Sequence, residues 1–167
     1  MAVGMPHMGE GTVLVGVGEI AVAEHPQVLV TQALGSCVGL VLWDPIRRAG
    51  GMAHIMLPAH ADTAMVGHRF RFATSAVPAL VDMLADAGSP KRRLVAKIAG
   101  GAAMFGADAG SASIGARNAA QTRLELHDLG IPLRAEDTGG GHARTIELHM
   151  DTGILLVRSY VFGLREI

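Results

Sequence analysis

The sequence is poor in cysteine, in charge and in long apolar runs. A single cysteine among 167 residues excludes an internal disulfide and any cysteine-rich zinc or iron–sulfur site. Lysine plus arginine number 14 against 15 aspartate plus glutamate, for a formal net charge of −1. The basic excess of a general nucleic-acid binder is therefore missing. The longest apolar stretches, such as 37–43, fall far short of the roughly 20 residues that a spanning helix needs.

These absences favour one broad class of protein. No secretory signal is visible, because residues 1–11 carry neither lysine nor arginine and no long apolar core. A lone thiol fits a reducing compartment. We therefore expect a cytoplasmic protein that binds no nucleic acid and inserts into no membrane.

The residues that are plentiful indicate one folded domain. Half of the chain is hydrophobic and only 17% is charged, a balance opposite to that of disordered proteins. The length suits a single core, and 22 glycines indicate many tight turns. We expect a flexible N-terminal tail over 1–11 and a single domain over 12–167.

The hydrophobic periodicity predicts mostly strands with two helices. Three- and four-residue spacing of apolar residues predicts helices over 71–87 and 113–129, closed by left-handed caps at Gly88 and Gly130. Alternating or continuous short apolar runs predict strands over 12–17, 28–31, 37–43, 51–57, 94–98, 131–135, 146–150 and 154–161. Since strands dominate both ends, the pattern favours an α+β layered domain over a doubly wound fold.

One pair of residues suggests covalent chemistry. A cysteine becomes a nucleophile when a base lies beside it. If the turn after Trp43 is centred between Pro45 and Ile46, the residue numbers of each directly paired couple add up to 91. Cys37 then lies directly opposite His54 on the same sheet face. The small residues Gly35 and Ser36 before the thiol would leave backbone N–H groups open to a developing oxyanion.

Simpler interpretations stand beside this one. Most single cysteines in cytosolic domains are small core residues, Gly35-Ser36 could be an ordinary turn, and a longer loop would shift the register. The remaining histidines show no metal-ligand spacing, and Gly100-Gly101 lacks a nucleotide-binding pattern. We therefore expect no metal and no cofactor.

Short segments distributed over residues 12–160 match one known family in order and spacing. They are Val17-Gly18-Glu19, Thr31, Leu34-Gly35-Ser36-Cys37, Met52-Ala53-His54-Ile55-Met56-Leu57-Pro58, Lys97-Ile98-Ala99-Gly100-Gly101-Ala102, Met104-Phe105, Ile114-Gly115-Ala116-Arg117-Asn118, Glu136-Asp137-Thr138-Gly139-Gly140 and Leu155-Leu156-Val157-Arg158. In these residues the chain resembles CheD, the chemoreceptor glutamine deamidases of bacterial and archaeal chemotaxis.

The resemblance implies a catalytic triad of Cys37, His54 and Thr31, with Gly35 and Ser36 at the oxyanion and substrate site. It implies a layered α/β sandwich of mostly antiparallel strands, similar to bacterial toxin deamidase domains, with papain-like active-site geometry. The implied substrates are glutamines of methyl-accepting chemotaxis proteins, converted to glutamate through a cysteine thioester without a cofactor.

Two alternatives remain open at this stage. The same thioester chemistry could cleave a glutamyl methyl ester of the receptor. The family resemblance also implies association with the phosphatase CheC, so a non-catalytic binding role that regulates CheC is the second alternative.

Overall fold

The computed structural model describes residues 11–59, 70–105 and 113–167, which form ten strands, two long helices and a short 3-10 helix at Lys91–Arg93. The two long helices are α1 (Ala73–Asp86) and α2 (Ile114–Asp128). The strands are β1 (Thr12–Leu14), β2 (Ile20–Glu24), β3 (Val28–Leu34), β4 (Val38–Asp44), β5 (Ala49–Ile55), β6 (Val95–Gly100), β7 (Leu133–Thr138), β8 (Arg144–His149), β9 (Leu155–Ser159) and β10 (Gly163–Glu166).

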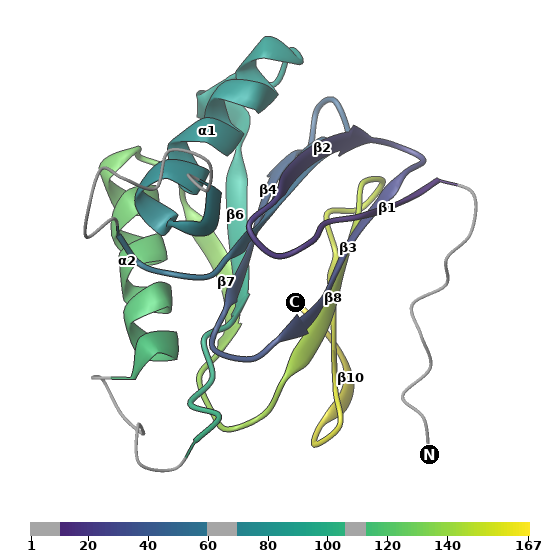
Figure 1. Cartoon of the computed structure of the whole chain (residues 1–167). Coiled ribbons are helices and arrows are strands. Elements are labelled where there is room, and N and C mark those ends of the chain that lie inside the picture. Colours follow the sequence, from purple (N-terminus) through teal and green to yellow (C-terminus); the bar gives the residue numbers. More distant parts are fainter. Residues whose placement is uncertain (1–10, 60–69, 106–112) are drawn as a thin grey trace.

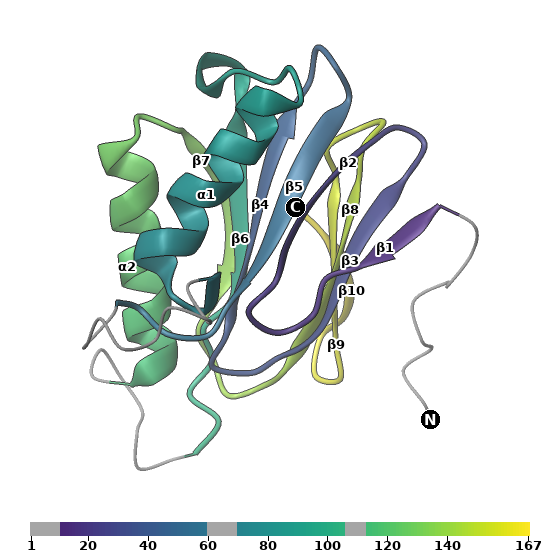
Figure 2. The same ribbon diagram turned by 45° about the horizontal axis from the view of Figure 1, so that its top comes forward.

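The strands form two five-stranded sheets stacked face to face. One sheet has the order β1-β3-β8-β9-β10 and the other β2-β5-β4-β6-β7. The β1–β3 and β6–β7 pairs are parallel, and the other pairings are antiparallel. Both helices lie against the outer face of the second sheet, and the first sheet packs on its inner face (Figures 1 and 2). The predicted α+β layered fold with two main helices and mostly antiparallel strands is confirmed.

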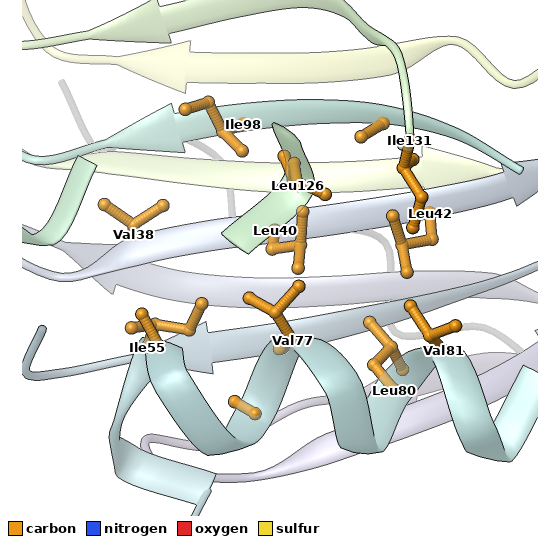
Figure 3. Close-up of a cluster of buried hydrophobic side chains, with 14 of the residues drawn as sticks. Val38, Leu40, Leu42, Ile55, Val77, Leu80, Val81, Ile98, Leu126 and Ile131 are labelled. Carbon is orange, nitrogen blue, oxygen red and sulfur yellow. The ribbon is translucent and has the colours of Figure 1, made fainter. Parts of the chain in front are cut away.

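The outer face of the second sheet is closed by the helices. Alternate residues of β4, namely Val38, Leu40 and Leu42, are fully buried and pack with Val77 and Leu80 of α1, as Figure 3 shows. This face follows the two-residue period of a strand and the helical period of α1. None of the described helices has the length and apolar content required to cross a membrane.

The intervening residues of the same strands face the other sheet. Val41 of β4 and Met52 of β5 pack with Leu29 of β3 and with Ile146 and Leu148 of β8. This second core therefore lies between the sheets. It matters for function because residues of β3, β4 and β5 meet in it.

The local sequence signals predicted the helices well. Gly88 and Gly130 adopt positive φ values of 97° and 71°, and the hydrogen bonds from Ser89 N to Leu84 O and from Ile131 N to Leu126 O close both helices. Both predicted caps are confirmed. The tail prediction falls almost entirely on residues 1–10, which lie outside the described residues.

Two short strands were not predicted. The β2 sequence IAVAE is apolar at four consecutive positions, without the alternation that marks a half-buried strand. All four residues of β10 are exposed, so no burial pattern could reveal that strand. Pairing with β5 and with β9, respectively, defines these two strands instead.

The predicted register of the β4–β5 hairpin is wrong by two residues. His54 pairs with Gly39, and Asp44 pairs with Ala49, so that four residues rather than two form the loop. The Asp44 carboxylate accepts hydrogen bonds from the N–H groups of Ile46 (3.0 Å) and Arg47 (3.3 Å). These bonds stabilise the longer turn, and Cys37 is therefore not directly opposite His54.

Asp44 is also the partner of Arg93 in a buried ion pair. The fully buried carboxylate accepts from Arg93 Nε at 3.0 Å and Nη2 at 2.8 Å. Burial alone would raise the pKa of Asp44, but hydrogen bonds from Arg93, Arg47 and Ile46 oppose it, so that the pKa lies below its ordinary value of 3.8.

We expect Asp44→Ala to lower the free energy of unfolding by about 3 kcal/mol, since it removes the acceptor of two backbone N–H groups and leaves Arg93 with the Gly88 carbonyl as its remaining acceptor. Because the folded-state pKa is depressed, the contribution is complete above pH 3.8 and is lost as the pH falls through that lower pKa. Urea denaturation of the variant and of an Asp151→Ala control, at an exposed turn, measures the effect. A loss no larger than in the control would contradict it.

Candidate active site

Thr31 and His54 meet across the space between the two sheets. Thr31 belongs to β3 of one sheet and His54 to β5 of the other, and both are buried, at 0% and 1% exposed. The Thr31 hydroxyl oxygen lies 2.7 Å from His54 Nδ1 and 2.6 Å from the carbonyl oxygen of Val15. The structure thus brings together two of the residues singled out in the sequence.

These contacts determine the tautomer of His54. A hydroxyl has one hydrogen, and the Val15 carbonyl can only accept, so the Thr31 hydroxyl donates to Val15. Nδ1 of His54 must then carry a hydrogen and donate it to Thr31. In the neutral imidazole this leaves Nε2 unprotonated. Nε2 is buried and has no hydrogen-bond partner among the described residues, so no described protein group engages its lone pair.

The backbone of His54 is held by the segment that connects β1 with β2. His54 N donates to Glu19 O at 3.1 Å, and Gly18 N donates to His54 O at 3.0 Å. Val15 belongs to the same connection. One short segment therefore supports the histidine at its main chain and, through Thr31, at its imidazole.

Cys37 lies one residue before β4, on the same side of the sheet as His54. It is half-buried and packs against the core cluster between the sheets. Gly39, two residues further along, is the pairing partner of His54. Diagonal neighbours within an antiparallel ladder have Cβ atoms somewhat less than about 7–8 Å apart, and Cys37 lies one residue beyond the last pair of this ladder, Val38 with Ile55.

Three consecutive carbonyl groups fix the segment that carries the thiol. Gly35 O accepts from Ala102 N at 2.9 Å, and Cys37 O accepts from Gly101 N at 2.8 Å. Ser36 O accepts from the side-chain amide of Asn118 at 2.9 Å. Gly100 permits this close approach, because a Cβ there would lie 2.3 Å from Cys37 O.

The N–H groups of the same segment differ in their availability. Gly35 N donates to Ala33 O at 3.1 Å. Those of Ser36 and Cys37 donate to no backbone carbonyl among the described residues. Ala33 has a positive φ of 58° and lies where the β3–β8 register is interrupted, so a bulge redirects the chain just before these two donors.

Burial shifts both candidate reactive groups toward their neutral forms. It raises the pKa of the Cys37 thiol above its ordinary value of 9.0 and lowers the pKa of His54 below 6.5. Both shifts therefore favour a neutral thiol and a neutral imidazole over a thiolate and an imidazolium at neutral pH.

Within the part of the chain that the structure describes, no three His, Cys, Asp or Glu side chains are grouped to hold a metal ion. The candidate reactive groups of this site are a thiol, Cys37, and a base, His54, which face the same space between the sheets. Such a pair attacks an acyl carbon and transfers a proton to the leaving group.

Comparison with known proteins identifies the family to which the chain belongs. A family model described as "CheD chemotactic sensory transduction" matches residues 56–159, more than half of the sequence. The chain belongs to the CheD family. The matched segment begins after His54, so it includes neither Cys37 nor Thr31.

Relatives in the CheD family cover the candidate site as well, since their alignments span most of this chain. The chemoreceptor glutamine deamidase CheD of Thermotoga maritima is 47% identical over 146 residues, 87% of this chain and 90% of its own. The probable chemoreceptor glutamine deamidase CheD of Caldanaerobacter subterraneus subsp. tengcongensis is 41% identical over 155 residues, 92% and 96% respectively. The probable chemoreceptor glutamine deamidase CheD 2 of Geobacter metallireducens is 47% identical over 156 residues, again 92% and 96%.

Sequence reasoning on this CheD-family chain missed three residues that support the site. Val15 receives the Thr31 hydroxyl hydrogen, Glu19 accepts from the His54 main chain, and Asn118 holds the Ser36 carbonyl. Glu19 and Asn118 lie within segments that match the family, and this match was the sequence signal that could have identified them. Val15 contributes only a backbone carbonyl, and no sequence pattern marks that role.

Proposed function

We propose that this chain is a cytoplasmic protein-glutamine deamidase that converts glutamines of methyl-accepting chemotaxis receptors to glutamate. The names of its CheD relatives support this substrate. The observation that carries the proposed mechanism is the hydrogen-bond relay from His54 through Thr31 to Val15. It presents an unprotonated Nε2 on the side of the sheet where Cys37 packs.

In the first half-reaction, Nε2 of His54 accepts the thiol proton of Cys37 as sulfur attacks the carboxamide carbon of a receptor glutamine. The resulting oxyanion accepts hydrogen bonds from the N–H groups of Ser36 and Cys37, and each such donor is worth about 2.7–4 kcal/mol in comparable acyl transfers. Protonated His54 then donates its proton to the departing nitrogen. Ammonia leaves, and Cys37 is joined to the glutamyl carbonyl as a thioester.

In the second half-reaction, neutral His54 accepts a proton from water, which attacks the thioester carbonyl. The carbon–sulfur bond breaks, His54 returns the proton to the Cys37 sulfur, and the glutamyl product is released as a carboxylic acid that loses its proton to solvent. The neutral resting pair suits this sequence, because His54 must be unprotonated at the start of each half-reaction.

Thr31 acts on His54 by accepting its Nδ1 hydrogen, which fixes the tautomer and the ring orientation. A hydroxyl stabilises an imidazolium less than a carboxylate would. Thr31 therefore contributes less to the rate than either Cys37 or His54.

Mass spectrometry of a helical chemoreceptor cytoplasmic fragment from the same organism tests the proposal. After incubation with this protein, specific glutamines should gain the mass difference between an amide and an acid. A parallel substrate with glutamyl methyl esters at the same positions measures esterase activity. Loss of the ester without conversion of the amide would replace the deamidase by a methylesterase. No change in either substrate would leave a binding role with CheC.

We expect Thr31→Val to reduce kcat by about 10- to 100-fold, because the Nδ1 hydrogen loses its acceptor and the tautomer is no longer fixed; this loss corresponds to the roughly 1–3 kcal/mol cost of an unpaired buried group. Steady-state assay of glutamine conversion measures the effect. Thr31→Ser restores the hydroxyl and should recover most of the activity. Equal activity of the valine and serine variants would contradict the role assigned to Thr31.

A further inference from the structure

We infer that Asn118 is a positioning residue that holds the nucleophile segment against the strand that carries the base. The inference rests on the proposed function of Cys37 and His54. Asn118 lies near the start of α2 and is fully buried. Its side-chain amide bridges two parts of the chain that are far from it and from each other in sequence.

The bridge consists of two hydrogen bonds from one nitrogen. Nδ2 of Asn118 donates to Ser36 O at 2.9 Å and to Met56 O at 3.0 Å. Ser36 immediately precedes Cys37, and Met56 follows His54 by two residues. One planar amide group therefore joins the segment that carries the thiol to the end of the strand that carries the imidazole, just beyond Val38 and Ile55, the last pair of the β4–β5 ladder.

No other side chain makes this connection among the described residues. The carbonyls of Gly35 and Cys37 instead accept from the backbone N–H groups of Ala102 and Gly101, whose hydrogen bonds do not reach β5. The helix itself is pressed against this backbone, because a Cβ at Gly115 would lie 2.3 Å from Ala102 O. Movement at the beginning of α2 would therefore reach the Cys37 segment through both connections.

The orientation of the amide follows from its neighbours. Two carbonyl oxygens can be satisfied only by the NH₂ end, so Oδ1 points elsewhere. Oδ1 is buried and has no hydrogen-bond partner among the described residues. Leaving a buried acceptor unpaired is unfavourable, and the two hydrogen bonds that Nδ2 donates to Ser36 O and Met56 O offset this cost.

The neighbouring residue Thr122 offers a matched control. It lies one helical turn after Asn118, is also fully buried, and donates from Oγ1 to Asn118 O at 2.8 Å. Its hydrogen bond stays within α2 and touches neither the Cys37 segment nor β5. Thr122→Ala should therefore reproduce the loss of a buried hydrogen bond in this helix without disturbing the site.

The test combines two measurements on the full chain. In Asn118→Ala, we expect kcat for glutamine conversion to fall about 100-fold with little change in KM, as a small displacement of reacting groups produces. Independently of any protein substrate, the rate at which iodoacetamide alkylates Cys37, the single cysteine, should fall to that of a His54→Ala variant. Thr122→Ala should retain both rates within about threefold, whatever its loss in Tm. If the alanine variant does not fold, the same two measurements are made on Asn118→Ser, which keeps a small polar side chain at this position.

The outcomes separate this inference from the proposed function. If Asn118→Ala keeps the parental alkylation rate while His54→Ala loses it, the positioning role is overturned and the catalytic pair stands. If Thr122→Ala loses the rates to the same extent as Asn118→Ala, the effect is general to the helix and the inference is also overturned. If the parent shows the expected alkylation differences but converts no glutamine, the deamidase proposal fails and the role of Asn118 is supported. Equal alkylation of the parent and His54→Ala overturns both.

Discussion

Replacing Cys37 with serine should abolish the conversion of receptor glutamine to glutamate while leaving the protein folded. The hydroxyl nearly matches the thiol in size, so the partly buried position tolerates it. Serine is a far weaker nucleophile without a stronger base, and the expected loss is at least about 10³-fold. The measurement is quantitative mass spectrometry of a chemoreceptor fragment incubated with equal amounts of parent and variant.

The sole cysteine makes this experiment easy to interpret. No second thiol in the sequence can substitute for Cys37. A receptor fragment that becomes attached to the parent protein and is released by hydroxylamine, which cleaves thioesters, would report the intermediate directly. Circular dichroism and Tm of the variant establish that it is folded. A serine variant that converts the same glutamines at a rate within about tenfold of the parent would exclude covalent catalysis by Cys37.

Replacing His54 with alanine should reduce kcat/KM by about 10²- to 10⁴-fold, the range typical for loss of a general base. The control is His149→Ala. His149 lies on β8, where it pairs with Val28 rather than with Thr31, and its half-buried imidazole lies 3.6 Å from the Glu147 carboxylate. Similar losses in the two variants would show that removal of a histidine from the sheets, and not base catalysis, accounts for the effect.

The same group determines the acid limb of the pH profile. His54 acts as a base only when neutral, so activity is full above its pKa and is lost as the pH falls through that value. Because burial lowers the pKa, the midpoint of this limb in kcat/KM should lie below pH 6.5. A midpoint above that value, or one that persists in the His54→Ala variant, would contradict the assignment.

The error in the hairpin register shows how far local reasoning reaches. The sequence predicts Cys37 as the residue paired with His54, so that the two residue numbers add up to 91. In the structure His54 pairs with Gly39, and the numbers add up to 93. A shift of two residues in one strand keeps every side chain on its original face, because strands have a period of two. The sequence therefore placed Cys37 and His54 on the same face even though it placed them at the wrong positions along the strands. The longer loop depends on how Asp44 caps it.

The sequence by itself determined the two helices with their glycine caps, most of the strands, the layered α+β class and the likeness to CheD. The helices, strands and fold class depend on periodicity and on residues adjacent in the chain, and the likeness to CheD depends on the order and spacing of short segments. The tertiary structure alone decided the contacts that build the site. Thr31 with His54, Thr31 with Val15, and Asn118 with Met56 and Ser36 are separated by 23, 16, 62 and 82 residues. No periodic pattern encodes such contacts, because they exist only after two sheets have stacked and a helix has packed against the outer face of one of them.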